Sequence, residues 1–114
     1  MFLDVDDYWF PDKLFRYKEI LNKKKDIDLL ISSYVRFSTK TEKFTIRKPI
    51  YPFRTLIKIY NPLPNCTSCI KRESLKTIRF KPINHEDWQF WIDINNKNPL
   101  LKVFVYDRID TIYL

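Results

Sequence analysis

The 114-residue sequence predicts an α+β protein whose strands and helices follow the order β-α-β-β-α-β, with an extra strand near the C-terminal end. Three observations predict this class. Apolar residues recur at helical spacing near the N-terminus, several later runs alternate apolar and polar side chains, and prolines separate these runs.

The first strand and the first helix are predicted within residues 1–30. Residues 2–10 alternate loosely and are rich in aromatic residues and valine, so we expect a strand there. Pro11 suits the first turn of a helix, and we expect that helix over residues 11–25, with a continuation to Leu30 as an option. Its apolar face consists of residues at helical spacing, which are Phe10, Leu14, Tyr17 and Leu21.

A hairpin is predicted in the middle of the chain, after an extended segment through Val35 and Phe37. Residues 43–47 alternate cleanly, with Phe44 and Ile46 expected inward and basic side chains outward. Two prolines make residues 48–53 a loop, and residues 54–60 are again typical of a strand. The sequence therefore predicts a hairpin of residues 43–60 with a proline-stiffened tip.

The second half of the chain is predicted to add one helix and two strands. Residues 70–79 carry a weak apolar stripe that indicates a helix, and the run from Trp88 to Ile94 alternates like a strand. On such a strand Trp91 faces away from Trp88, so we expect it to contact a partner protein, RNA or the C-terminal strand. A turn over residues 95–99 precedes a last strand.

These elements together predict a ferredoxin-like arrangement with a projecting β-hairpin and an extra C-terminal strand. We expect the α+β domain to span residues 1–94 and a C-terminal extension to span residues 95–114. Two helices should then lie on one face of a four-stranded sheet.

The chain contains no glycine, and this excludes several nucleotide-binding and catalytic motifs. A P-loop, a dinucleotide-binding turn and a nucleophile elbow each need glycine where the backbone approaches a ligand or turns sharply. Alanine is also absent, whereas Ile, Lys, Asn, Phe and Tyr are frequent. Because these frequent residues have A/T-rich codons, we expect a gene from an A+T-rich organelle, virus or plasmid.

The net charge of +7 is concentrated in the middle of the chain. Residues 1–10 carry three Asp and no basic residue, whereas residues 11–81 carry 18 Lys and Arg against six Asp and Glu. Residues 82–114 are slightly acidic. A basic body between acidic ends is typical of a protein that binds a phosphate backbone. The alternative is a solvated lysine-rich surface that reflects codon usage.

A family resemblance lies in the basic middle of the chain. Residues 39–49, Thr-Lys-Thr-Glu-Lys-Phe-Thr-Ile-Arg-Lys-Pro, resemble a signature of the S-ten family of small-subunit ribosomal proteins. Residues 54–59 follow at the position of that family's next strand, and the order of the later elements also agrees. The resemblance covers about residues 2–94.

The resemblance implies a structural role in the head of the small ribosomal subunit. Members of the family insert a long hairpin into ribosomal RNA and contact neighbouring head proteins. By position, the basic and hydroxyl residues of this hairpin are Thr39, Lys40, Lys43, Arg47, Lys48 and Arg54. Independently of the resemblance, outward bases at strand spacing suit a phosphate backbone. Tyr51 and Phe53 then either stack on unpaired bases or close the protein's own core.

A second basic cluster and two small motifs remain. If residues 70–79 are helical, one face carries the three basic residues Arg72, Lys76 and Arg79, which makes either a second phosphate contact or a solvated face. Cys66 and Cys69 form a C-x-x-C motif that lacks a second cysteine pair. We interpret it as two unliganded thiols. The alternatives are a metal shared with His85 or with another chain, and redox or disulfide chemistry. His85 beside two acids lacks a nucleophile, so we expect no catalytic residue.

The sequence therefore predicts a non-enzymatic RNA-binding protein of a mitochondrial small ribosomal subunit, encoded in the organelle. Its partners are ribosomal RNA and neighbouring head proteins, and we expect no cofactor, metal, membrane or small-molecule substrate. No apolar run reaches the length of a spanning helix, and the acidic N-terminus is unlike a targeting peptide. The alternatives are a viral or plasmid-encoded protein-interaction module, or an accessory subunit of an organellar complex.

Overall fold

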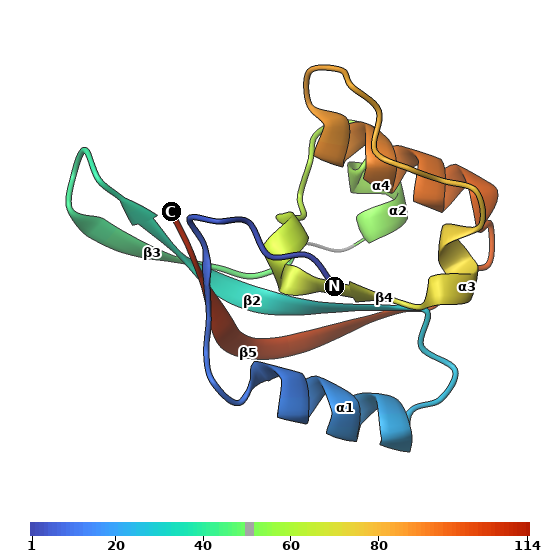
Figure 1. Cartoon of the computed structure of the whole chain (residues 1–114), viewed down its shortest axis with the longest axis horizontal. Helices are drawn as coiled ribbons and strands as arrows, with labels where there is room; N and C mark the ends of the chain where they lie inside the picture. The colour runs from blue at the N-terminus through green and yellow to red at the C-terminus, as the bar shows by residue number, and fades with distance from the viewer. Residues whose placement is uncertain (50–51) are drawn as a thin grey trace.

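The computed structural model, which describes residues 1–49 and 52–114, is an α+β fold built on one mixed five-stranded sheet (Figure 1). The strands are β1 (Tyr8–Trp9), β2 (Leu29–Ser38), β3 (Lys43–Arg47), β4 (Ser68–Ile70) and β5 (Val103–Tyr113). The helices are α1 (Lys13–Lys23), α2 (Phe53–Leu56), α3 (Arg72–Leu75) and α4 (Glu86–Lys97), with a 3₁₀ turn η1 (Asn65–Thr67). The predicted α+β class is confirmed.

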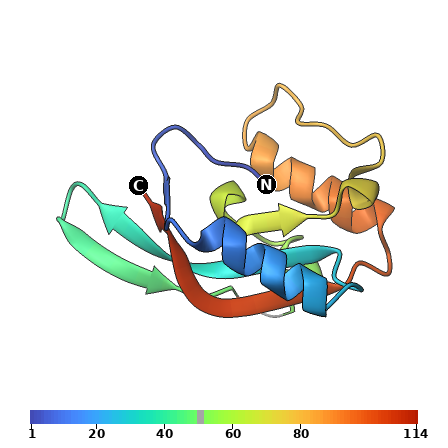
Figure 2. The same cartoon turned by 60° about the horizontal axis from the view of Figure 1, so that its bottom comes forward.

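The sheet has the strand order β1-β5-β2-β3, and β4 pairs with the first part of β2. β5 runs parallel to β2, whereas the pairs β1–β5, β2–β3 and β2–β4 are antiparallel. The β2–β5 register shifts on either side of Ser33, and Figure 2 shows β5 as a long, strongly bent strand. The expected C-terminal extension therefore supplies a strand that lies between β1 and β2.

Helices cover both faces of this sheet (Figures 1 and 2). On one face, α2, α3 and α4 enclose the larger apolar core, which includes Leu29, Ile31, Ile57, Phe90, Trp91 and Ile94. On the other face, α1 packs over a smaller cluster of Tyr17, Ile27 and Leu30. The successive residues of β2 alternate between the two cores, as the pleat of a strand requires.

The first helix is confirmed, but its buried face differs from the predicted one. Tyr17 is buried and Leu21 is half-buried, whereas Leu14 lies 57% exposed. Lys13, one residue earlier, takes the inward position and is fully buried. α1 therefore turns Lys13, and not Leu14, toward the sheet, because Lys13 has polar partners inside the protein.

Two predicted strands are not strands in the structure: residues 88–94 are helical, and residues 54–60 are a short helix followed by a turn. Residues 54–60 begin within α2, where Pro52 occupies the position before the first helical residue and Phe53 and Ile57 turn inward one helical turn apart. Residues 88–94 lie in α4, whose first turn carries two acidic residues that favour a helix start. Trp91 is fully buried there, so the prediction of a partner contact for it is wrong.

The remaining differences concern the hairpin and the second predicted helix. β3 pairs with β2 through the turn at residues 39–42, so the hairpin lies one strand earlier than predicted. Residues 70–79 contain only the single turn α3 after β4. The ferredoxin-like arrangement is not confirmed, because α1 lies on the face of the sheet opposite to α2, α3 and α4.

Candidate nucleic-acid interface

A ribbon formed by residues 34–47 of β2 and β3 projects from the body of the molecule (Figure 1), and at its base Val35 and Arg36 also pair with β5. Directly opposed residues share a face of an antiparallel pair. One face therefore carries the pairs Tyr34 with Arg47, Arg36 with Thr45 and Ser38 with Lys43. The opposite face carries Val35 with Ile46 and Phe37 with Phe44. The ribbon is thus amphipathic, with one basic face and one apolar face.

The basic face of the ribbon is open to solvent. Arg36, Lys43 and Arg47 are exposed, and Lys40 lies exposed in the turn that joins the strands. Within residues 1–49 and 52–114, no carboxylate lies within ion-pair distance of these four side chains. Unneutralised cations at strand spacing present a row of positive charge that suits a polyanion.

The turn of the ribbon forms without glycine. Residues 39–42 make the turn, and Glu42 adopts the left-handed backbone conformation with φ 52°. This region costs a residue with a Cβ roughly 1–2 kcal/mol, and glycine adopts it without that cost. Thr39 and Lys40 are exposed at the tip, at the outermost end of the ribbon.

The apolar face of the ribbon is not part of the core, contrary to the inward positions predicted for Phe44 and Ile46. These side chains are 65% and 60% exposed. Phe37 and Phe44 lie against one another across the strands, with ring centroids 4.8 Å apart. A β3 edge with large apolar side chains is a surface that proteins normally cover or blunt with charge.

Lys48 follows β3 at the base of the ribbon and is tied to β5. Its Nζ donates to Asp107 Oδ2 at 3.0 Å, and both side chains are largely exposed. The hydroxyl of Ser33 donates to the other oxygen of the same carboxylate at 3.2 Å. These two hydrogen bonds, led by the one from Lys48, lower the pKa of Asp107. Lys48 is thus partly neutralised, unlike the cations farther along the ribbon.

Three predicted contact residues follow the ribbon, and the structure does not group them with it. Tyr51 lies outside the described residues. Phe53 is 4% exposed within the large core, so it closes the core and cannot stack on a base. Arg54 is half-buried and donates hydrogen bonds to the carbonyls of Asn95, Asn98 and Pro99. Its guanidinium therefore caps the C-terminal end of α4 and is not directed at a ligand.

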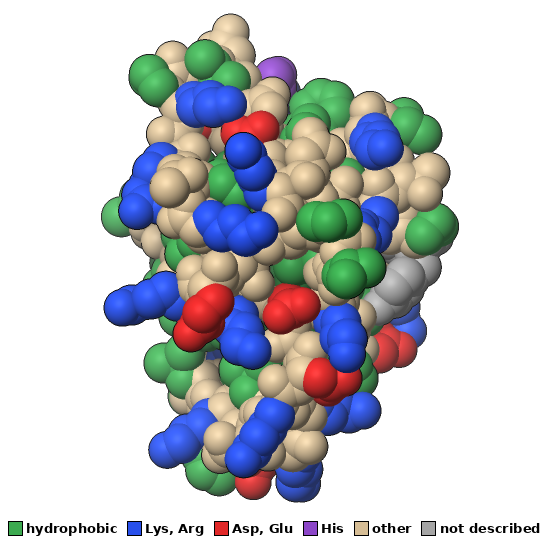
Figure 3. Space-filling model, turned by 90° about the vertical axis from the view of Figure 1, so that its right-hand side faces the viewer, with side chains coloured by type: hydrophobic (Ala, Val, Ile, Leu, Met, Phe, Trp, Pro, Cys, Tyr) green, Lys and Arg blue, Asp and Glu red, His purple; other side chains and the backbone are tan. Residues whose placement is uncertain are grey.

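The three basic residues of the second cluster do not share a helix face, because α3 ends at Leu75 and Lys76 has φ 50°. The three residues, which are Arg72, Lys76 and Arg79, nevertheless line one hollow of about 380 Å³. The apolar wall of this hollow includes Phe2, Phe80 and Phe90. Figure 3, which views the side of the molecule that carries α3, shows Lys and Arg side chains interspersed with hydrophobic ones. The cluster is therefore brought together by the folded loops and not by helical periodicity.

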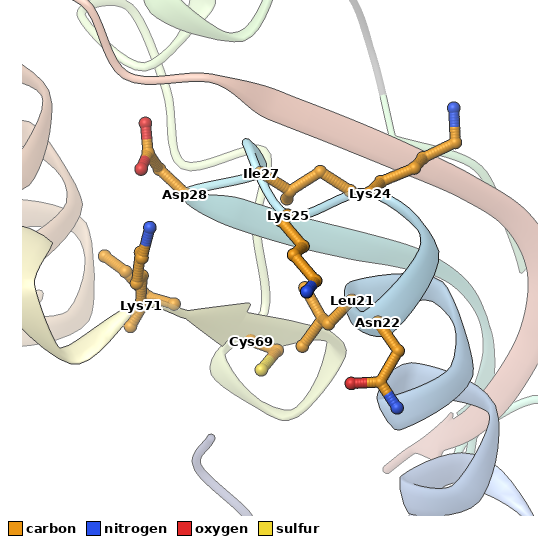
Figure 4. Close-up of a pocket in the computed structure, with 9 residues that line it drawn as sticks. Leu21, Asn22, Lys24, Lys25, Ile27, Asp28, Cys69 and Lys71 are labelled. Atoms are coloured by element: carbon orange, nitrogen blue, oxygen red, sulfur yellow. The ribbon is translucent and has the colours of Figure 1, made fainter.

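A second hollow of about 350 Å³ lies between the C-terminal end of α1 and β4 (Figure 4). Lys24, Lys25 and Lys71 line it together with Cys69, and Figure 4 labels each of these side chains. Burial raises the pKa of the Cys69 thiol, so this group is a neutral thiol at neutral pH. The hollow offers charge to an anion, and the described residues that line it include no aromatic ring.

The two cysteines are free thiols in different surroundings. Cys66 is fully buried in η1, whereas Cys69 is half-buried in β4. Burial, reinforced by Asp7, raises the pKa of the Cys66 thiol. His85 is exposed at the start of α4, with its ring 6.4 Å from that of Trp88. Among the described residues, no group of three or more His, Cys, Asp and Glu side chains is placed to hold a metal ion.

Sequence reasoning missed a buried polar cluster beneath α1. The Nζ of Lys13 donates to Asp110 Oδ1 at 3.0 Å, to Thr111 Oγ1 at 2.6 Å and to the carbonyl of Cys66 at 2.8 Å. Lys13 and Asp110 are 0% and 1% exposed. Ser32 Oγ also donates to Asp110 Oδ1, at 2.6 Å. The cluster joins the start of α1 to β5, β2 and η1.

Two aromatic rings complete this cluster. The Lys13 Nζ lies 5.2 Å from the ring centroid of Trp9 and 5.1 Å from that of Tyr17. Burial lowers the pKa of Lys13, and Asp110 acts in the opposite direction. Lys13 and Tyr17 are one helical turn apart, so they lie on the same face of α1. The sequence spacing could therefore have placed Lys13 beside Tyr17 on the buried face of the helix. The cluster is closed to solvent, so it is a structural element and not a binding site.

No protein-family model matches the chain, and no curated protein matches it. The described helices are all too short or too polar to cross a membrane. Among the described residues, exposed cations gather on the basic face of the ribbon and around the two hollows at the opposite end of the molecule.

Proposed function

We propose that the protein is a structural RNA-binding protein of the mitochondrial small ribosomal subunit, of the S-ten kind, and that it performs no catalysis. The observation that carries the proposal is the ribbon, whose exposed cations have no ion-pair partner among the described residues. The proposal rests on the ribbon and does not use the predicted ferredoxin-like topology.

The ribbon suits RNA for geometric reasons. Arg36, Lys43 and Arg47 share one face, and Lys40 extends the row to the tip. Backbone contacts of this kind fix the position of a protein on a folded RNA without reading its sequence. The planar guanidinium groups of the two arginines suit phosphate oxygens in a bidentate manner. The basic ribbon thus acts as a positioning element for ribosomal RNA.

The apolar face of the same ribbon favours a neighbouring protein as the second partner. Phe44 and Ile46 are largely exposed on an edge strand, where an RNA phosphate backbone gains nothing from them. A small ribosomal protein is placed between RNA and other proteins, so opposite faces of one ribbon serve both contacts. This supports a subunit-head location with neighbouring proteins. The same face suits the alternative function of a protein-interaction module.

The test is salt-dependent binding to an RNA fragment that comprises the head domain of a small-subunit ribosomal RNA. We expect Lys43→Gln/Arg47→Gln to weaken binding about tenfold and to reduce the slope of log K against log salt by about 1 to 2, since each cation releases counterions. The matched control is Lys18→Gln/Lys23→Gln, which removes the same charge from the exposed face of α1. An equal loss in both variants would show diffuse charge attraction and contradict the ribbon interface.

A further inference from the structure

We propose that the hollow beside Phe80 binds a single unpaired nucleotide, with the base against the Phe80 ring and the phosphate at Arg72 and Arg79. That this nucleotide belongs to RNA rests on the proposed function. The site itself is argued from the geometry of three phenylalanine rings and from the charges around them.

The aromatic rings form a rigid platform. Phe80 stacks on the buried Phe90 with ring centroids 4.2 Å apart and an interplanar angle of 16°. Phe2 is edge-on to both rings, with its centroid 5.2 Å from that of Phe80 and 5.6 Å from that of Phe90. Because these two distances are nearly equal, Phe2 lies beside the stack and not on its outer end. Neither ring therefore covers the outer face of Phe80, whose side chain is 40% exposed.

A ring of this kind is a base-stacking surface. Every nucleobase has a π-face, so an aromatic platform accepts any unpaired base. Phe80 is also the residue where three hollows meet, since it lines each of them. The largest contribution to binding should therefore come from this one ring, which the buried Phe90 supports from behind.

The charges around Phe80 are arranged asymmetrically. Arg72, Lys76 and Arg79 line the hollow on one side. Asp4 and Glu86 line the shallower hollow on another side of the same ring. A phosphate is attracted to the first side and repelled from the second, so the charge distribution orients a nucleotide on the platform.

The three cations are not equally available. Lys76 Nζ donates to the carbonyl of Lys97 at 2.7 Å, and Arg79 donates to the carbonyl of Ile78 at 2.7 Å. Arg79 keeps further N–H donors, because a guanidinium has five. Arg72 is exposed and makes no ion pair within the described part of the chain. The arginines are therefore the phosphate ligands, and Lys76 contributes long-range attraction.

The hollow between α1 and β4 provides an internal comparison. It has a similar volume and three lysines, yet none of the described residues that line it is aromatic. These described residues can attract phosphate but offer no ring on which a base could stack. The volume of about 380 Å³ beside Phe80 falls within the range of small-ligand sites, about 300–1,000 Å³, and suits one nucleotide.

The test is an NMR titration of the isotope-labelled full chain with adenosine 5′-monophosphate, and in parallel with inorganic phosphate. We expect saturable shifts confined to residues around Phe80, and binding of the nucleotide at least tenfold tighter than that of phosphate. Phe80→Leu should weaken nucleotide binding about tenfold, and Phe80→Trp should retain it. The matched control is Phe15→Leu, which changes an exposed phenylalanine on α1 and should bind as the wild type does.

Two results would overturn the pocket. One is a Phe80→Leu variant that binds the nucleotide as tightly as the wild type. The other is inorganic phosphate binding as tightly as the nucleotide, which would leave only a cation cluster. If Phe80→Leu perturbs folding, Arg72→Gln/Arg79→Gln tests the phosphate contact instead, with an expected loss of about tenfold for the nucleotide and no loss for adenosine.

The ribbon variant separates this inference from the proposed function. Lys43→Gln/Arg47→Gln should bind adenosine 5′-monophosphate as the wild type does, because the ribbon projects from the side of the molecule opposite to α3 (Figure 1). Nucleotide binding without any binding of ribosomal RNA would leave the pocket in place and remove the ribosomal assignment. Binding of ribosomal RNA without nucleotide binding would do the reverse.

Discussion

The two halves of β2 have opposite surroundings. Its first half, residues 29–33, is almost fully buried between two helical layers. Its second half pairs with β3 in the ribbon, keeps β5 as a neighbour as far as Arg36, and projects beyond that residue. The same strand thus contributes to the core at one end and to a solvent-exposed basic surface at the other. Residues that stabilise the fold and residues proposed to bind RNA thus occupy opposite ends of β2. Substitutions near the first end should lower the free energy of unfolding, whereas substitutions near the second end should weaken RNA binding.

The largest effect should come from the polar cluster that supports the buried half. Lys13→Ala leaves the carboxylate of Asp110 buried without its cation, and we expect a loss of about 3–5 kcal/mol in the free energy of unfolding. Replacing both charges, as Lys13→Met/Asp110→Leu, should restore most of the stability. Urea denaturation measures both variants. A Lys13→Ala protein as stable as the wild type would show that the ion pair does not support the buried half.

Substitutions of Arg54 and Arg47 should have smaller effects, one on stability and the other on RNA binding. Arg54→Gln removes hydrogen bonds to the end of α4 and should cost about 1–2 kcal/mol, while RNA binding stays unchanged. Arg47→Gln should change stability by less than about 0.5 kcal/mol and weaken RNA binding, since it is exposed on the ribbon. Thermal unfolding and RNA titration on the same samples distinguish the two. If Arg54→Gln weakened RNA binding at full stability, it would belong to the interface.

The buried region should also respond to alkaline pH. The pKa of the Cys66 thiol is raised above its ordinary value of 9.0 by burial and by Asp7. The unfolded chain loses this proton near pH 9 while the folded chain keeps it, so the contribution of Cys66 is complete below pH 9 and decreases above it. Between pH 8 and pH 10, the wild type should lose about 1 kcal/mol more than Cys66→Ala. If the free energy of unfolding had the same pH dependence in both proteins, Cys66 would not be the source of the alkaline loss.

The smallest effect should come from the turn of the ribbon. Glu42→Gly relieves the left-handed conformation and should stabilise the protein by at most about 1 kcal/mol. A larger change is not expected, because the ribbon lies outside both apolar cores. The melting temperature checks this, with Glu19→Gly in the interior of α1 as a control that should be destabilising. A destabilised Glu42→Gly variant would mean that the Glu42 side chain itself supports the turn.

The sequence predicted those elements whose patterns are long or unambiguous. The helix at α1 and the strand β3 were correctly expected, because apolar residues recur at helical spacing in α1 and residues 43–47 alternate without a break. Only the later part of β2, around Val35 and Phe37, was expected, since its first residues were an optional end of the helix. Residues 88–94 were misassigned because Phe90, Trp91 and Ile94 satisfy helical spacing while the run also alternates. The pairing of β3 with β2 depends on a turn without glycine or proline, which carries little local signal.

The candidate site was predictable only in part, for a related reason. Charge and strand spacing predicted that Lys43 and Arg47 are contact residues, and the structure leaves both exposed on one face of the ribbon. Local sequence could not show that Arg54 caps the distant helix α4. The pocket at Phe80 joins residues from the N-terminal segment, the α3 region and α4, and such long-range contacts leave no pattern in the sequence. Lys13 was overlooked because a lysine on a helix is normally exposed.

The most direct test of contact between the ribbon and RNA is ultraviolet cross-linking of the full chain to small-subunit ribosomal RNA, followed by peptide mass spectrometry. We expect cross-links within residues 36–47 of the ribbon, and none on the exposed face of α1. Cross-links confined to α1, or an absence of cross-links from the ribbon in a complex that does form, would contradict this expectation.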